Sequence, residues 1–184
     1  MRVVGGSARG IRLAPVPRGV RPVSDMAREG VFSSLGDRVV GARVLDLFAG
    51  TGAMAIEALS RGAGAALLIE RDRAAVRTIR ENLRRARLEA HAEVVTSAVQ
   101  PFLMRDDNPP EPFDLVIADP PYDVSEEIVR GVLAELATGW LAKPSWRVVL
   151  TRPKKASTPV IPVHWLAARR LSYGDTLVLI FQEA

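Results

Sequence analysis

The chain has 184 residues, of which 48% are hydrophobic, and a formal net charge of +4, so its length and composition predict one folded core rather than several. It contains no cysteine and two histidines far apart, His91 and His164, which argues against disulfides and against a bound metal. No apolar run approaches the roughly twenty residues that span a bilayer, and the N-terminus has no secretory segment, so we expect a cytoplasmic protein without a membrane partner.

The first 24 residues are basic and contain no acidic residue. Their arginines are Arg2, Arg9, Arg12, Arg18 and Arg21. Glycines and prolines in the same stretch predict a short β-hairpin or extended arm, so we divide the chain into a basic arm, 1–24, and a domain, 25–184. Arginines without neighbouring acids favour binding to the phosphates of a nucleic acid.

A glycine-rich loop separates an apolar strand predicted over 43–48 from a helix predicted over 53–60. Its candidate cofactor-binding residues are Asp46, Phe48, Ala49, Gly50, Thr51 and Gly52. The glycines let the backbone approach a ligand, and the helix start directs N–H groups towards it. Glu70, with Arg71 beside it, follows the next strand, where its carboxylate can bind ribose hydroxyls. The loop also fits a dinucleotide site or a purely structural turn, but Asp46 can meet a cationic amino group, which favours S-adenosylmethionine.

Apolar segments and helical patterns alternate along the rest of the chain. Strands are predicted near 43–48, 66–70, 92–96, 113–118 and 146–151, and helices over 53–60, 73–86 and 125–136. This alternation predicts an α/β fold, a mostly parallel sheet with helices on both faces. The last part differs, because 165–171 and 176–181 have no helix between them and predict an antiparallel hairpin at the sheet edge. Arginines along 73–87 are interpreted as a solvated helix face.

The four residues Asp119, Pro120, Pro121 and Tyr122 come directly after the apolar run 115–118. An exocyclic amine on a nucleobase is a weak nucleophile, so a site for it must accept its hydrogens and hold the base flat. The Asp119 carboxylate and the Pro120 carbonyl can accept both hydrogens, and Tyr122 offers a ring for stacking. The alternative is a simple turn after a buried strand.

The carboxyl ends of parallel strands meet at one edge of a sheet. Gly50, Glu70, Ser97 and Asp119 each follow a predicted strand, so we expect them to converge there. A second basic tract, with Arg152, Lys154 and Lys155, follows the fifth strand and is a further candidate for RNA phosphates.

Taken in order, the motifs resemble the bacterial RsmD-type 16S ribosomal RNA guanine-N2 methyltransferases. The resemblance lies in Arg2–Gly6 with Arg9-Gly10, Arg21-Pro22, Arg28-Glu29, the loop Asp46–Gly52, the tetrapeptide Asp119–Tyr122 and Tyr173–Thr176. It implies the class I methyltransferase fold, which is Rossmann-like, with S-adenosylmethionine as donor and S-adenosylhomocysteine as product. It also implies a monomer that acts on a guanine of 16S rRNA within a small ribosomal subunit or an assembly intermediate.

One position departs from related methyltransferases, which often carry an aspartate after the third strand to contact the adenine. This chain has Ser97-Ala98 there, so we expect Ser97 and backbone groups to bind the adenine. Three alternative functions remain open: a DNA adenine-N6 methyltransferase, a non-catalytic RNA-binding assembly factor, and a dinucleotide oxidoreductase.

Overall fold

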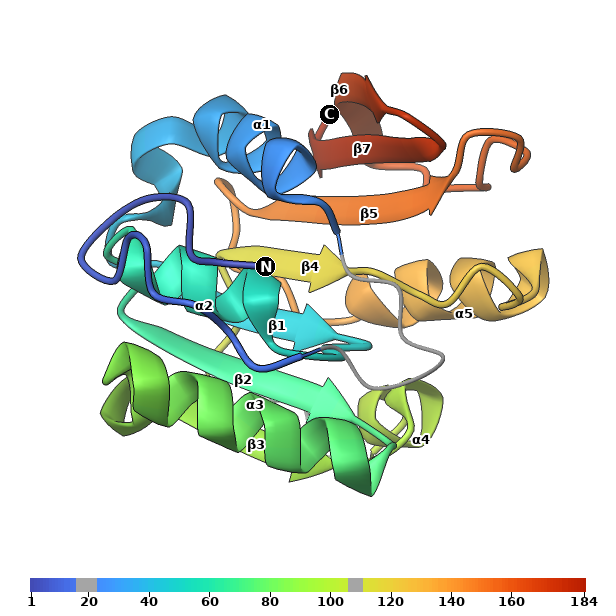
Figure 1. Cartoon of the computed structure of the whole chain (residues 1–184). Coiled ribbons are helices and arrows are strands. Elements are labelled where there is room, and N and C mark those ends of the chain that lie inside the picture. The colour runs from blue at the N-terminus through green and yellow to red at the C-terminus, as the bar shows by residue number, and fades with distance from the viewer. Residues whose placement is uncertain (16–22, 106–110) are drawn as a thin grey trace.

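The computed structural model describes residues 1–15, 23–105 and 111–184. These residues form a seven-stranded sheet in the order β3-β2-β1-β4-β5-β7-β6 (Figure 1). Its strands are β1 Arg43–Leu47, β2 Ala65–Glu70, β3 Ala92–Thr96, β4 Leu115–Ala118, β5 Arg147–Pro153, β6 Trp165–Tyr173 and β7 Thr176–Glu183. The first five are parallel, and β7 pairs antiparallel with both β5 and β6. The predicted fold class is therefore confirmed.

Helices cover both faces of the sheet (Figure 1). The α-helices are α1 Asp25–Leu35, α2 Ala53–Ser60, α3 Arg73–Ala86, α4 Val99–Leu103 and α5 Glu126–Leu136, with short 3-10 turns at Gly36–Val39 and Glu89–His91. Apolar side chains of α1, α2 and α3 share one core cluster, and those of α4 and α5 share the cluster on the opposite face. The sheet is thus buried between two helical layers.

Local sequence explains most of these elements. Strand β4 is buried along its whole length, as expected of a central parallel strand that reads as a continuous apolar run. Helices α1, α3 and α5 begin after Ser24, Asp72 and Ser125, whose side chains accept backbone N–H groups of the first turn. Helix α1 was not predicted, although Ser24 followed by Asp25 is the ordinary signal of a helix start.

The predicted C-terminal hairpin is present and is longer than expected. Strand β6 continues to Tyr173 and β7 begins at Thr176, so the loop contains Gly174 and Asp175 alone. Gly174 has φ 56°, a conformation that two-residue hairpin turns require and that glycine adopts readily. Strand β4 begins at Leu115, two positions later than predicted.

The order of the parallel strands places a switch point at the centre of the sheet. From β1 the chain moves outward through β2 to β3 and then returns to β4 on the other side of β1. Leu47 at the end of β1 lies opposite Ala118 at the end of β4, so the residues that follow both strands are neighbours. Ligands of such sheets bind outside the carboxyl ends of the strands at this point.

The described part of the arm, residues 1–15, packs against the face that carries α1, α2 and α3. Val3, Ala8 and Leu13 are buried in that core, and an antiparallel bridge joins Arg2 to Arg12. The division between arm and domain stays a proposal. Among the described helices, none is both long enough and apolar enough to cross a bilayer.

Candidate active site

Three residues of the loop between β1 and α2 have positive φ angles. Phe48, Gly50 and Gly52 have φ values of 59°, 57° and 74°. Glycine adopts such angles without strain, whereas a phenylalanine in this region is strained, and strain of this kind is concentrated at functional sites. A Cβ at Gly52 would also lie 3.2 Å from Ile79 of α3, so the loop is packed closely onto the neighbouring helix.

Glu70 and Asp46, both predicted to bind the cofactor, accept hydrogen bonds from the backbone of this loop and of the helix that follows it. The Glu70 side chain accepts the backbone N–H of Gly50 at 2.8 Å and that of Asp72 at 2.8 Å, so it joins the glycine loop to the loop that follows β2. Asp46 accepts the backbone N–H of Ala55 at 3.1 Å in the first turn of α2. Asp46 is only 1% exposed, so it lies beneath the loop rather than on its open surface.

Three acidic side chains, those of Asp46, Asp119 and Glu70, lie close together at this edge of the sheet. Burial raises the pKa of Asp46 well above its ordinary value, and the neighbouring charges of Asp119 and Glu70 raise it further, against the hydrogen bond from Ala55. A cation beside these carboxyl groups would lessen the repulsion between them. That Asp46 meets a cationic amino group stays a prediction, which this arrangement favours.

The tetrapeptide begins where β4 ends, beside the glycine loop. The backbone N–H of Asp119 donates to the carbonyl of Leu47 at 3.3 Å, and Pro120 is buried while Pro121 is exposed. Burial raises the pKa of Asp119 to about 6, although a hydrogen bond from Thr151 lowers it in part. The Tyr122 side chain is 39% exposed, and its hydroxyl lies 3.0 Å from Oγ1 of Thr176.

The remaining predicted cofactor-binding residues lie at the same edge of the sheet. Ser97 follows β3, donates its backbone N–H to the Glu70 carbonyl at 3.0 Å and its hydroxyl to the Ala98 carbonyl at 3.0 Å. Ala98 and Arg71 are exposed. From β3 to β4, the loops that follow the strands thus form a continuous rim that holds every predicted cofactor residue and the tetrapeptide.

In the second basic tract, Arg152 is buried whereas the two lysines are exposed. Arg152 is buried on β5, with 3% exposure, and forms an ion pair with Glu126 at the start of α5. A guanidinium held in this way is not presented to phosphates, so the structure does not support the prediction that Arg152 binds RNA. Lys154 and Lys155 are exposed.

Two threonines and an asparagine at the rim were not identified from the sequence. Thr151 donates its hydroxyl to the Asp119 carboxylate, and Thr176 contacts Tyr122. Asn82 of α3, fully buried, donates to the carbonyl of Thr51 at 2.9 Å and accepts the backbone N–H of Ala14 at 2.6 Å. No local pattern marks such residues, because their partners are distant in the sequence.

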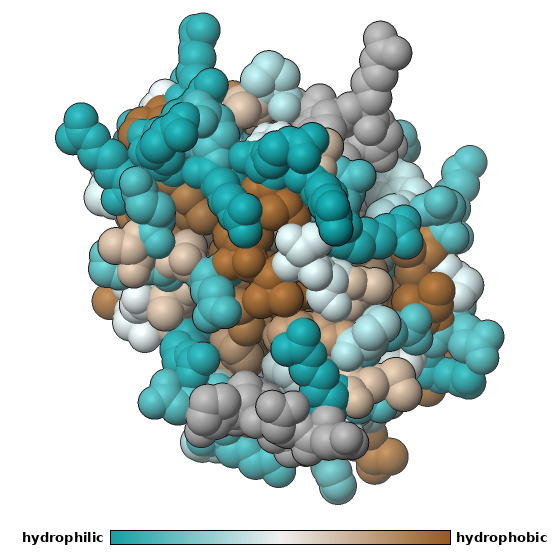
Figure 2. Space-filling view, turned by 90° about the horizontal axis from the view of Figure 1, so that it is seen from below, coloured by the Kyte–Doolittle hydropathy of each residue, from teal (hydrophilic) through white to brown (hydrophobic). Residues whose placement is uncertain are grey.

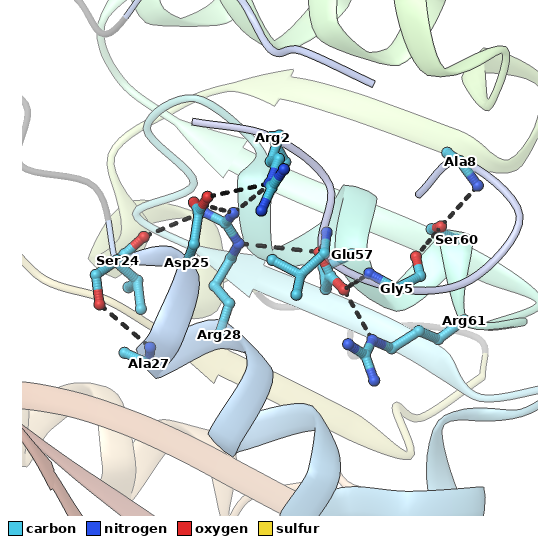
Figure 3. A network of polar contacts seen from close by, with 12 residues as sticks. Arg2, Gly5, Ala8, Ser24, Asp25, Ala27, Arg28, Glu57, Ser60 and Arg61 are labelled. Atoms are coloured by element: carbon cyan, nitrogen blue, oxygen red, sulfur yellow. Dashed lines mark hydrogen bonds and ion pairs between the residues drawn. The ribbon is translucent and has the colours of Figure 1, made fainter. Parts of the chain in front are cut away.

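Glu57 of α2 anchors the arm from inside the core (Figure 3). Its buried carboxylate accepts the backbone N–H groups of Val4 at 2.8 Å and Gly5 at 2.7 Å, and it pairs with Arg28 at 3.9 Å and Arg61 at 2.8 Å. Breaking a buried ionic network by removing one partner costs about 3–5 kcal/mol. The arm is therefore part of the folded core rather than a loose extension.

Of the five arm arginines predicted to bind RNA, three lie in the described part of the arm. Arg9 and Arg12 are exposed, and Arg2 keeps 69% of its side chain exposed while its guanidinium lies 3.9 Å from Asp25 (Figure 3). Arg18 and Arg21 lie outside the described residues. The exposed guanidinium groups thus belong to a segment whose backbone is hydrogen-bonded to Glu57 in the core.

Hydrophilic side chains surround a narrower apolar area when the molecule is viewed from below (Figure 2). On α3, Arg73, Arg77 and Arg80 are exposed, and Arg84 pairs with Glu81. Exposure of these groups fits the interpretation of a solvated helix face.

A hollow of about 310 Å³ lies elsewhere, at the amino ends of the strands. Its lining includes Arg43, Ala65, Ala92 and Phe113 and none of the predicted site residues. The rim, where the strained loop and the perturbed carboxyls meet, is the better candidate for chemistry.

The similarity to known proteins extends over nearly the whole chain. Residues 1–182 match the protein family described as Conserved hypothetical protein 95. A ribosomal RNA small subunit methyltransferase D of Escherichia coli (strain K12) is 37% identical over 100% of this chain and 90% of its own length. A putative rRNA methyltransferase of Bacillus subtilis (strain 168) is 30% identical over 100% of this chain and 99% of its own. The solved structure of a putative methyltransferase from Escherichia coli superposes with a TM-score of 0.85 at 34% identity, covering 100% of this chain and 97% of that one.

Proposed function

The chain belongs to the ribosomal RNA small subunit methyltransferase D family, and from this premise we propose that it methylates the exocyclic N2 of a guanine in 16S rRNA, with S-adenosylmethionine as the methyl donor. Within that RNA we propose a guanine of the position 966 type as the acceptor, which is what the resemblance read from the sequence implies. The substrate would be a small ribosomal subunit or its assembly intermediate, and the enzyme a cytoplasmic monomer.

One observation carries the proposal: the glycine loop and the tetrapeptide meet at the switch point. Leu47 and Ala118 are paired at the ends of β1 and β4, and Asp119 is close enough to Asp46 to raise its pKa. A donor held by the first loop would therefore face a base held by the second. Holding both reactants in line is the main task of an enzyme for this displacement.

The donor half of the site consists of residues after β1, β2 and β3. Gly50 and Gly52 leave room for close backbone contact, and the carboxylates of Asp46 and Glu70 favour a cationic ligand. Ser97 and Ala98 stand where the adenine would lie. When bound, S-adenosylmethionine supplies an electrophilic methyl group attached to a sulfonium.

The acceptor half consists of Asp119, Pro120 and Tyr122. The Asp119 carboxylate and the Pro120 carbonyl accept the two amino hydrogens of the guanine, and the exposed ring of Tyr122 stacks on the base. Because the pKa of Asp119 is about 6, its carboxyl is ionised at neutral pH and basic enough to take the proton that the nitrogen releases.

Exposed basic groups would bind the RNA backbone. Arg9, Arg12, Lys154 and Lys155 are exposed. The arm reaches the rim, because Ala14 bonds to Asn82, which in turn bonds to Thr51 of the glycine loop. Contacts to phosphates are sensitive to salt and carry little sequence information, so specificity would come from the shape of the ribosomal particle.

The test is transfer of labelled methyl groups to small ribosomal subunits isolated from cells that lack the protein. Naked 16S rRNA and DNA are assayed in parallel, and the labelled nucleoside is identified by mass. N2-methylguanosine in the particle is the expected product. N6-methyladenine in DNA alone would instead favour a DNA methyltransferase, and no label despite measured cofactor binding would favour an assembly factor.

The RNA surface needs a test that leaves the fold intact. Deleting the arm would remove Val3, Ala8 and Leu13 from the core, so charge removal is cleaner. The double variant Arg9→Ala with Arg12→Ala should weaken RNA binding. The slope of the logarithm of the RNA-binding constant against the logarithm of the salt concentration should become shallower by about 1–2. Arg105→Ala with Arg130→Ala, which removes two exposed arginines elsewhere, is the control. An unchanged salt slope in the arm variant would contradict the proposal.

A further inference from the structure

Side chains of β5 and β7 contact the acceptor loop, residues 119–125. Thr151 of β5 donates to Asp119, and Thr176 of β7 contacts Tyr122 at 3.0 Å. The neighbouring Arg152 pairs with Glu126, where the loop ends and α5 begins. Strands β5 and β7 are directly paired, with Pro153 opposite Thr176, so these contacts come from one small region of the sheet.

Thr151 is a rigid donor for the Asp119 carboxylate. It is fully buried in the middle of a strand, and a β-branched side chain there has little rotational freedom. Its hydroxyl donates to Oδ1 of Asp119. A carboxylate can accept at both oxygens, so a bond to Oδ1 restricts the orientation of the group and leaves acceptor capacity for a second donor.

Thr176 plays the corresponding part for Tyr122. It is the first residue of β7, directly after the tight turn Gly174-Asp175. The turn is held on two sides: Lys154 donates its backbone N–H to the Asp175 carbonyl at 2.7 Å, and Tyr173 packs so closely on α1 that a side chain at Gly30 would collide with its hydroxyl. Thr176 is therefore held in place by its neighbours, and the Tyr122 hydroxyl lies 3.0 Å from its Oγ1.

We propose that Thr151 and Thr176 are positioning residues for methyl transfer, with Thr151 directing the Asp119 carboxylate and Thr176 fixing the plane of the Tyr122 ring. The inference rests on the proposed function for its consequence in catalysis. It assigns a role to the segment Tyr173–Thr176, which neither the donor half nor the acceptor half accounts for. The two hydroxyls touch the catalytic groups and not the base.

Thr151 is tested with Thr151→Val, which keeps the shape and removes the hydroxyl, and with Thr151→Ser, which restores it. We expect Thr151→Val to lower kcat about 10- to 100-fold with little change in the affinity for S-adenosylmethionine, and Thr151→Ser to recover most of the activity. Losing a donor to the charged form raises the pKa of Asp119, so the acidic limb of the kcat/KM profile should move to higher pH. Thr96→Val, on the edge strand β3, is the matched control and should behave as wild type.

A second readout does not depend on activity. The Asp119 carboxyl is titrated by carbon-13 NMR in wild type, Thr151→Val and Thr151→Ser, and only the valine variant should show a raised pKa. An unchanged pKa would overturn the inference for Thr151 whether or not the wild type methylates guanine. A loss of activity equal at every pH and not recovered by serine would also overturn it, because that pattern belongs to a packing defect.

Thr176 is tested by a double-mutant cycle with Tyr122. If the two hydroxyls act as one unit, Thr176→Val, Tyr122→Phe and the double variant should each lower kcat/KM by the same factor, about 3- to 10-fold. Thr176→Ser should retain wild-type activity. Additive losses in the double variant, or full activity in Thr176→Val, would overturn the role of Thr176. The wild-type product assay separates either result from a failure of the proposed function.

Discussion

The donor half and the acceptor half of the site are built in different ways. In the donor half, the bonded residues are close in the sequence, since Ala55 and Asp46 are 9 positions apart and Gly50 and Glu70 are 20 apart. In the acceptor half, Asp119 and Thr151 are 32 apart, and Tyr122 and Thr176 are 54 apart. These donor-half bonds thus lie within the unit from β1 to the end of β2, whereas the acceptor half takes contacts from β5 and β7, much later in the chain. Substitutions in the two halves should therefore affect different steps.

The largest effect is expected in the acceptor half. Asp119→Ala should lower turnover by about three orders of magnitude, because it removes both the acceptor for the amino hydrogen and the candidate base. Affinity for S-adenosylmethionine, measured by calorimetry, should change by less than about threefold. Asp123→Ala, which removes an exposed carboxyl of the same loop, is the control and should keep turnover. Near-normal turnover in Asp119→Ala would remove this residue from the mechanism.

A smaller and opposite pattern is expected in the donor half. Glu70→Ala leaves the backbone N–H groups of Gly50 and Asp72 without their acceptor, so the loop loses its fixed shape. Hydrogen bonds to charged groups contribute about 1.5–3 kcal/mol, which corresponds to a 10- to 100-fold weaker affinity for S-adenosylmethionine. Turnover at saturating donor should stay within a few-fold of wild type. Glu93→Ala, an exposed glutamate on β3, is the comparison, and an affinity equal to wild type in Glu70→Ala would refute the assignment.

The same difference in sequence distance explains what could be predicted. Alternating apolar and helical patterns predicted the parallel strands and the α/β fold class, and the residues from Asp46 to Gly52 marked the donor loop, because both signals lie within short stretches of the chain. The comparisons confirm the family resemblance. Thr151 carries no such mark, since a threonine in a strand is ordinary and only the folded sheet brings it to its partner. Thr176 was marked only as part of the segment Tyr173–Thr176 that resembles the family, and the sequence did not indicate its contact with Tyr122. Arg152 was misjudged for a related reason, because its position beside two lysines suggested exposure and its partner Glu126 is 26 positions away.

The third expected effect concerns stability rather than catalysis. In the folded protein the pKa of Asp119 is about 6, against 3.8 for an unperturbed aspartate. Well below pH 4 the carboxyl is protonated in both folded and unfolded chains and the shift has no effect. Between about pH 4 and 6 the unfolded chain loses this proton while the folded chain keeps it, so the free energy of unfolding falls as the pH rises, and the loss is complete once the pH has passed the folded pKa of about 6. Each pKa unit corresponds to 1.36 kcal/mol, and with partial solvation the loss should be about 1–3 kcal/mol.

Asp119→Asn removes this ionisation and keeps an oxygen that can accept from Thr151. The variant should therefore be more stable than wild type at pH 8, with an advantage that shrinks as the pH is lowered and disappears near pH 4, because only the wild type titrates in that window. Urea unfolding at a series of pH values measures the difference, and Asp123→Asn reports the effect of removing an exposed carboxyl from the same loop. An advantage that grew towards low pH would contradict the raised pKa. The predicted trend would mean that the acceptor half keeps a basic carboxylate at the expense of folding stability, which a residue retained for packing alone would not do.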